Sequence, residues 1–159
     1  MVVATFLALS VLSGQSLFTC APTPLDDRLP DVIAVMAGAS PIGLVDGSAG
    51  LPWPGADTLI KSAWVLSRDA AGDLHVEGRR LDAPGTLLFQ DGSEGQPSPV
   101  LTITDPWGKG RSVRPGGASP EILRSYSFVM FYLIYPSRGC WEITAQLGMD
   151  TVHIVREVK

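Results

Sequence analysis

The sequence predicts an all-β protein, specifically an antiparallel β-sandwich. Three observations support this fold class: short apolar runs recur along the chain, turn-forming residues separate them, and no long run has the period of an amphipathic helix. The 159 residues include 17 Gly and 13 Pro, and charged residues make up 18%, compared with about 25% in typical domains. Many short strands joined by turns favour an antiparallel sandwich over a parallel α/β sheet.

Eight segments have the composition and alternation of β-strands. They are 32–37, 59–67, 74–81, 86–90, 100–104, 126–135, 141–147 and 151–158. The connections between them, such as RDAAGD and RPGGASP, contain the Gly, Pro and Asp that tight turns need. Ser119 followed by Pro120 provides an N-cap with proline at the first helical position. This pattern predicts one short helical turn over 119–123.

The last two predicted strands form a hairpin. Every second side chain of 141–147, beginning with Trp141, is apolar and is expected to point into the core. Gly148 and Met149 fit a two-residue turn with Gly at its first central position. On the returning strand the same alternation places His153 on the outer face.

The segment 126–135 contains SFVMFYLIY, which is apolar on both faces of a strand. Such a strand is either central and covered on both sides, or it has a partly buried outer face. The second alternative leaves an apolar patch that a partner would cover. It supports a structural or assembly subunit as an alternative function.

Residues 1–20 are expected to be an export signal, 21–30 a linker rich in Pro and charge, and 31–159 the β-sandwich domain. The early run VVATFLALSVL has the length of a signal-peptide apolar region and is too short to span a bilayer. No charged residue precedes Asp26, whereas such signals usually begin with Lys or Arg. We expect an exported, extracytoplasmic protein.

The four residues Leu17-Phe18-Thr19-Cys20 resemble the lipobox of bacterial lipoproteins, in which Leu lies three residues before Cys. The resemblance implies a lipid anchor at Cys20 that attaches the protein to a membrane. Because the chain has two cysteines, two solutions are open. The favoured one is a lipidated Cys20 with a free Cys140. The other is a Cys20–Cys140 disulfide, which contributes about 4–5 kcal/mol in the chain-entropy model. Cleavage after Ala21 would remove Cys20 altogether.

The C-terminal residues YPSRGCWEITAQLG and HIVREVK, together with GLVDG at 43–47 and KSAW at 61–64, resemble small exported lipoproteins of Gram-positive bacteria. These proteins end in a P-S-x-G-x-W strand, a tight turn and a V-x-V-x-K strand, and their function is unknown. The resemblance implies an immunoglobulin-like sandwich. It implies no catalytic residues.

The composition argues against several function classes. A net charge of −4 disfavours nucleic-acid binding, which needs a basic surface to displace counterions. The two cysteines and two histidines lack the spacing of a metal site, and the chain has no phosphate-binding loop, so we expect neither metal nor cofactor. It has no G-x-S-x-G motif, and we expect no enzyme activity. A hydrolase remains a third alternative, because four carboxylates in predicted loops and strands meet in some folds: Asp91, Glu94, Asp105 and Glu142.

Two tryptophans lie in Pro- and Gly-rich loops, and three cations follow the second one. Loop tryptophans form stacking surfaces for sugars, and the cations make a local positive site in an acidic chain. The ligand-binding residues predicted on this basis are Trp53, Trp107, Lys109, Arg111 and Arg114. Alternatively, each Trp covers one end of the core and the cations form a solvated loop.

These observations predict a non-catalytic, envelope-associated binding module. Its expected ligand is a cell-wall or carbohydrate polymer, or a protein partner.

Overall fold

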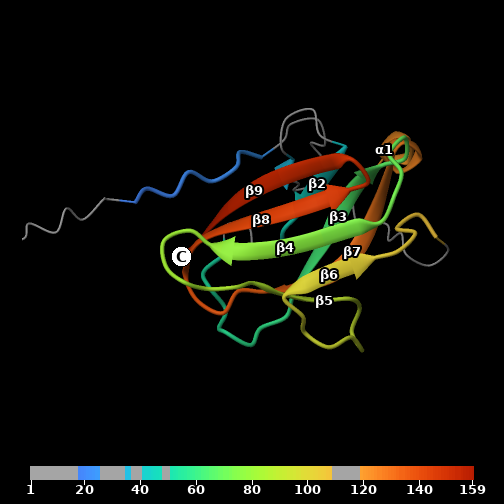
Figure 1. Cartoon of the computed structure of the whole chain (residues 1–159). Coiled ribbons are helices and arrows are strands. Elements are labelled where there is room, and N and C mark those ends of the chain that lie inside the picture. Colours follow the sequence, from blue (N-terminus) through green and yellow to red (C-terminus); the bar gives the residue numbers. More distant parts are fainter. Residues whose placement is uncertain (1–17, 26–34, 37–40, 48–50, 109–118) are drawn as a thin grey trace, which may run out of the picture.

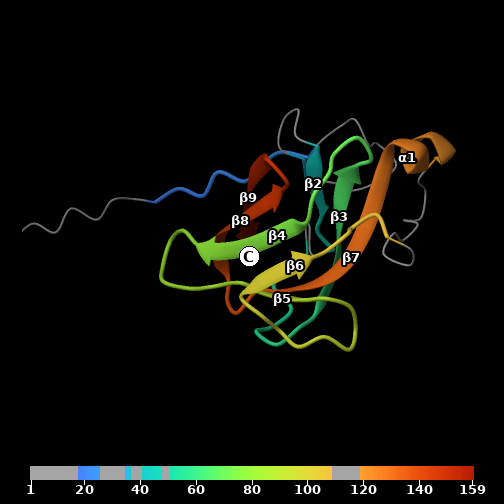
Figure 2. The same ribbon diagram turned by 45° about the vertical axis from the view of Figure 1, so that its right-hand side comes forward.

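Two antiparallel sheets make up the structure, a computed structural model that describes residues 18–25, 35–36, 41–47, 51–108 and 119–159. The described part of the chain contains nine strands and one short helix. The sheets pack face to face as two layers, as Figure 1 and the turned view in Figure 2 show. This layering is that of immunoglobulin-like sandwiches. The predicted antiparallel β-sandwich is confirmed.

The five-stranded sheet has the order β1-β2-β3-β7-β5. In register, Trp64 of the third strand lies opposite Leu44 of the second and Val129 of the seventh. The strands are β1 (Val35–Met36), β2 (Ile42–Val45), β3 (Ile60–Ser67), β7 (Tyr126–Ile134) and β5 (Leu88–Gln90).

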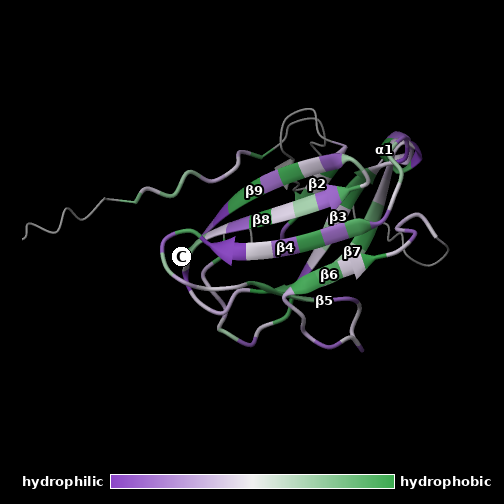
Figure 3. Cartoon of the chain, in the orientation of Figure 1, coloured by the Kyte–Doolittle hydropathy of each residue, from purple (hydrophilic) through white to green (hydrophobic). Residues whose placement is uncertain are grey.

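The four-stranded sheet has the order β6-β4-β8-β9 and lies in front in Figure 1. Its strands alternate between buried apolar and outward polar side chains, which produces the striped colouring in Figure 3. The strands are β6 (Val100–Ile103), β4 (Leu74–Arg80), β8 (Gly139–Leu147) and β9 (Asp150–Val158).

The predicted elements correspond closely to the observed ones from residue 59 onward. The helix α1 (Pro120–Ser125) begins where predicted, and the Ser119 hydroxyl accepts a hydrogen bond from the Ile122 backbone N–H at 3.3 Å. β2 was not predicted, because IGLV is only four residues long and contains a glycine. Of the strand predicted at 32–37, only the two residues of β1 are described. In the described part of the chain, no helix has the length and apolar character that crossing a bilayer requires.

Aromatic side chains fill the core between the two sheets. Trp64 stacks on Phe131 with ring centroids 5.4 Å apart, and Phe89 approaches the same ring at 6.3 Å. Tyr135, just after β7, packs against Trp141 of the opposite sheet at 6.1 Å. These contacts join both sheets into one continuous cluster, which is the main core of the domain.

β7 is central and is covered on both faces, which answers the question raised by its apolar sequence. Its inner face enters the main core. On its outer face, Phe128 and the neighbouring Val65 are fully buried, with Ile122 and Leu123 of α1 packed against them. The apolar residues of this strand are therefore largely covered within the chain.

A buried polar contact joins the two sheets at one end. Asp46, which follows β2, accepts a hydrogen bond from the Tyr135 hydroxyl at 3.1 Å and one from Arg156 Nε at 3.0 Å. The Asp46 side chain is 1% exposed and that of Arg156 is 12% exposed. Asp46 and Tyr135 directly follow strands of the five-stranded sheet, whereas Arg156 belongs to β9 of the four-stranded sheet. Burial raises the pKa of Tyr135 well above its usual value, and the negative charge of Asp46 raises it further.

The raised pKa of Tyr135 predicts a loss of stability in alkali. Below about pH 10 the Tyr135 hydroxyl is neutral in both the folded and the unfolded state. Above about pH 10 this hydroxyl ionises in the unfolded chain but stays neutral in the folded protein. The unfolding free energy therefore falls by about 1.4 kcal/mol per pH unit. We expect Tyr135→Phe to flatten this fall and to cost about 1–3 kcal/mol at neutral pH, because Asp46 loses a donor. Urea unfolding across this pH range measures both effects. The control is Tyr132→Phe on the outer face of β7. An unchanged slope in Tyr135→Phe would contradict the prediction.

The β8–β9 hairpin has the predicted two-residue turn. Gly148 has φ +59°, a left-handed conformation that costs a side chain about 1 kcal/mol. A Cβ at this position would also collide with the Ala71 carbonyl oxygen of the β3–β4 connection. Met149 beside it is fully exposed.

We expect Gly148→Ala to lower the unfolding free energy by about 1–3 kcal/mol, the sum of backbone strain and displacement of the β3–β4 connection. Chemical denaturation measures this loss. Met149→Ala, at the other position of the same turn, is the control and is expected to change stability by less than about 0.5 kcal/mol. Equal effects from the two substitutions would contradict this interpretation of the turn.

Candidate functional site

The outer face of the four-stranded sheet is polar and hollowed along its middle. Two adjoining hollows of about 290 Å³ and 190 Å³ share three lining residues, Glu77, Val100 and Thr144. Together they form one elongated depression, which we call the β4 groove. Its further lining residues are His75, Val76, Gly78, Arg79, Thr86, Pro99 and Gln146.

The groove follows β4, because that strand supplies its floor. His75, Glu77 and Arg79 alternate with buried residues and therefore all point outward. From His75 to Arg79 the strand rises by about 13 Å. β6 forms one wall through Val100, and β8 forms the other through Thr144 and Gln146. The result is an elongated site rather than a closed pocket.

Hydrogen bonds between neighbouring strands fix several polar side chains of this face. His75 Nδ1 lies 3.2 Å from the hydroxyl of Thr102, its register partner on β6. His153 Nδ1 lies 3.2 Å from the hydroxyl of Thr144, its partner on β8. Both histidines are exposed, as the strand alternation predicts for His153. The groove therefore presents ordered hydroxyl and imidazole groups.

The two charged residues on the groove floor differ in their partners. Arg79 donates from Nε to Glu142 Oε1 at 2.9 Å, and its Nη2 lies 2.9 Å from the same oxygen. The Glu77 side chain is exposed, and its carboxylate forms no hydrogen bond or ion pair with the described residues. The groove thus combines uncharged hydrogen-bonding groups with one carboxylate that has no counter-charge among them.

Trp53 covers the end of the core at which β8 begins. Its indole N–H donates to the Tyr135 carbonyl oxygen at 3.0 Å, and its backbone N–H donates to the carbonyl of Lys159, beyond the end of β9, at 2.7 Å. The Arg138 guanidinium lies 5.9 Å from the centre of its ring. The side chain is half-buried against the core, so Trp53 acts mainly as a cap.

Trp107 covers the opposite end. It follows β6, which ends at Ile103. Ile103 pairs with Leu74 of β4, and Leu74 pairs in turn with Leu147, the last residue of β8. Trp107 is half-buried against the same core, and its indole nitrogen has no hydrogen-bond partner among the described residues.

The structure therefore does not bring the two predicted binding tryptophans together. Trp53 and Trp107 lie at opposite ends of the sandwich, and each packs on the core. Lys109, Arg111 and Arg114 lie outside the described residues. No single surface of the described chain contains both tryptophans.

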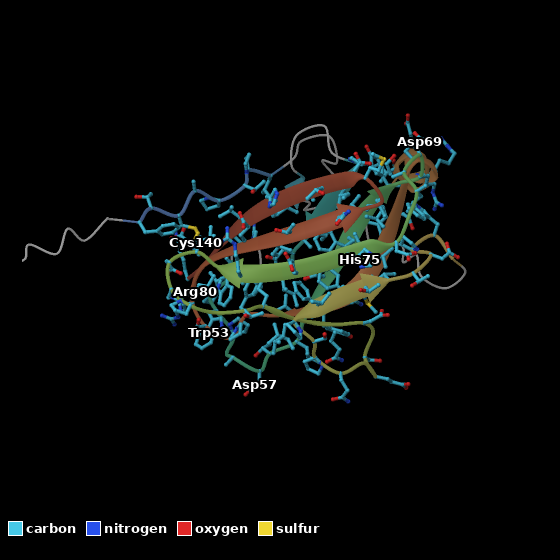
Figure 4. The ribbon with its side chains drawn as sticks, in the orientation of Figure 1. Trp53, Asp57, Asp69, His75, Arg80 and Cys140 are labelled. Carbon is cyan, nitrogen blue, oxygen red and sulfur yellow. A yellow bond between two sulfur atoms is a disulfide. The ribbon has the colours of Figure 1, made fainter. Side chains whose placement is uncertain are left out.

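Arg80 organises the end of the sandwich occupied by Trp53, and Figure 4 shows both residues there with Cys140. Its Nε donates to Asp82 Oδ1 at 2.6 Å, and its Nη1 donates to the Ser137 hydroxyl at 3.0 Å. Its guanidinium also lies 6.0 Å from the ring centre of Trp141. The hydrogen bond from Arg80 lowers the pKa of Asp82. Arg80 thus has partners within the chain that account for its position.

The two cysteines form a disulfide, Cys20–Cys140, with Cα atoms 5.6 Å apart. The prediction of a free Cys140 is wrong. The bond occupies the Cys20 sulfur, the atom to which a lipid would be attached, so the lipid anchor expected at Cys20 is incompatible with this structure. The sequence favours lipidation of Cys20 over the disulfide, because no local pattern places residue 20 beside β8.

Residues 18–25, which we call the N-terminal strap, lie against β9 beyond the disulfide. The backbone N–H of Thr23 donates to the Val155 carbonyl at 2.9 Å, and the Val155 N–H donates to the Thr23 hydroxyl at 2.8 Å. Part of the segment predicted as a linker is thus attached to the domain. It covers some of the exposed edge of β9.

The carboxylates considered for hydrolysis do not converge on one site. Glu142 on β8 pairs with Arg79 on β4. Asp105 lies beyond the opposite end of the sheet, where its backbone N–H donates to Asp73 Oδ1 at 3.4 Å. Asp91 and Glu94 belong to the β5–β6 connection. In the described part of the chain, no group of three or more His, Cys, Asp or Glu side chains is placed to hold a metal ion.

The groove residues were missed as a site although their signal was present. LHVEGRR alternates apolar and polar residues, which indicates that His75, Glu77 and Arg79 share one outward face. What the sequence lacks is the order of the strands, which places Val100 and Thr144 on either side of Glu77.

Comparison of this chain with protein-family models, with curated proteins and with solved structures found no match. The resemblance to Gram-positive lipoproteins stays a prediction. Function has to be argued from the groove itself.

The disulfide predicts two measurable properties of the protein. Alkylation without reduction should modify no cysteine, and mass spectrometry should find residues 20 and 140 in one cross-linked peptide without added lipid. Cys140→Ser should lower the unfolding free energy by up to about 4–5 kcal/mol, because the bond closes a loop of 120 residues. Ser137→Ala, in the connection just before β8, is the control and should cost no more than the hydrogen bond that its hydroxyl accepts from Arg80, about 0.5–1.5 kcal/mol. A free Cys140 together with a lipid-modified Cys20 would refute the bridge.

Proposed function

We propose that this protein is an exported, non-catalytic binding module that holds an extended polymer in the β4 groove, with a carbohydrate as the favoured ligand. The observation that carries the proposal is the continuous depression along β4, lined by hydrogen-bonding side chains from three strands. An elongated, open site suits a chain-like ligand better than a small compact molecule, which proteins usually enclose.

The rigidity of the site supports a binding role. The groove side chains come from paired strands, and the register hydrogen bonds of His75 and Thr144 hold them in place. Binding to a preformed surface avoids the entropy loss of ordering loops. The groove is therefore a better-defined candidate than the two separate tryptophan loops.

The disulfide supports the extracytoplasmic part of the proposal. Structural disulfides persist in oxidising compartments outside the cytoplasm. A bond that fixes the strap next to β9 stabilises the domain where no cellular reductant maintains free thiols. An envelope location therefore fits the covalent structure.

Thr144 provides the sharpest test, because this residue lines both hollows. Binding to soluble cell-wall and plant glycans is measured by isothermal titration calorimetry and by shifts of groove resonances in NMR spectra. We expect Thr144→Val to weaken binding about two- to tenfold, the effect of one lost hydrogen bond of about 0.5–1.5 kcal/mol.

Thr151→Val is the matched control, because Thr151 is exposed on β9 of the same sheet but does not line the groove. It is expected to bind like the unmodified protein. The bound glycan should keep its chain length after long incubation, whereas release of shorter products would identify a hydrolase. Glycan binding that is insensitive to Thr144→Val would place the site elsewhere.

A further inference from the structure

Glu77 occupies the centre of the β4 groove. It lies opposite Val100 on β6 and opposite Thr144 on β8, and it lines both hollows. Neither cross-strand neighbour carries a charge. A ligand that follows the groove therefore passes directly over this carboxylate.

The charges around Glu77 leave it uncompensated. Arg79, two residues along the same face and about 7 Å away, is already paired with Glu142. The three residues together carry one net negative charge. A ligand with a positive group above Glu77 gains a charge-assisted hydrogen bond, which is stronger than a bond between neutral groups.

The position of β4 favours a sugar over a peptide as the source of that positive group. Peptides that bind to sheets usually add to an exposed edge through their backbone, but β4 pairs with β6 on one side and β8 on the other. The backbone of β4 is therefore already paired, and the groove side chains are the groups available for hydrogen bonds. Thr86, Thr144 and Gln146 supply hydroxyl and amide groups, and Val100, 49% exposed, supplies an apolar wall for the C–H face of a sugar ring.

We propose that the β4 groove binds a glycan carrying free amino groups, with the Glu77 carboxylate accepting a hydrogen bond from a sugar ammonium group. This inference rests on the proposed function of the groove and specifies its ligand. It predicts that the same glycan binds more weakly when its amines are acetylated, because acetylation removes the charge.

Chitosan oligomers and N-acetylated chitin oligomers of equal length are the probes, at a mildly acidic pH at which the sugar amine is protonated and the carboxylate is ionised. Calorimetry on the whole disulfide-bonded chain measures each affinity. We expect Glu77→Gln to weaken chitosan binding about fivefold, the effect of an exposed ion pair of about 1 kcal/mol. Chitin binding should be unchanged. Glu121→Gln is the charge-matched control, because Glu121 lies on α1, which packs against the five-stranded sheet and not near the groove.

The outcomes separate this inference from the proposed function. One outcome is that both oligomers bind equally, that Glu77→Gln has no effect, and that Thr144→Val weakens the binding of both. In that case the groove binds glycans, but the proposed preference for amines is wrong. If neither oligomer binds, the inference is overturned, and the wider glycan panel decides the proposed function separately. If oligolysine binds in a Glu77-dependent manner while chitosan does not, the ligand is a basic peptide and the sugar assignment fails. Loss of chitosan binding in Glu121→Gln would show a general charge effect and would also overturn it.

Discussion

The contact of Asp46 with Tyr135 and Arg156 is the constraint on which the arrangement of the two sheets depends. A carboxylate that is 1% exposed destabilises the fold by several kcal/mol unless it is paired and hydrogen-bonded. Two of its donors come from the end of β7 and from β9 of the opposite sheet, so its hydrogen bonding depends on how the two sheets are placed. Hydrophobic packing alone would tolerate small shifts between the layers. The polar contact selects one of these arrangements.

This constraint also positions the segments around it. The backbone of Trp53 bonds to the end of β9, the strand that contains Arg156, and its indole bonds to the carbonyl of Tyr135. The N-terminal strap bonds to β9 at Val155, next to Arg156. One end of the sandwich is thus closed by a loop, the strap and the disulfide. The aromatic and cationic residues there mainly maintain the structure, which explains why Trp53 is a poor candidate for ligand binding.

The parts of the fold that depend on local patterns could be predicted from the sequence, and the parts that depend on distant pairing could not. The alternation of β8 and β9, the glycine turn at Gly148 and the Ser119 cap each involve residues a few positions apart. The contact of Asp46 with Arg156 spans 110 positions, and the disulfide spans 120. Nothing in the local sequence specifies such pairs. The same limit applies to the groove, because Glu77 can be assigned to an outer face by alternation but not to a position between Val100 and Thr144.

The two outer faces of the sandwich differ in a way that explains where a ligand can bind. On the five-stranded sheet, α1 packs over Phe128 and Val65, and this outer face is used for stability. On the four-stranded sheet, the outward side chains are mostly polar, with hydroxyls, imidazoles, an amide, an ion pair and the Glu77 carboxylate beside the apolar Val100. The Glu77 carboxylate forms no ion pair with the described residues. Since an exposed carboxylate contributes little to folding in the absence of a counter-charge, Glu77 is free to contact the ligand proposed for the groove.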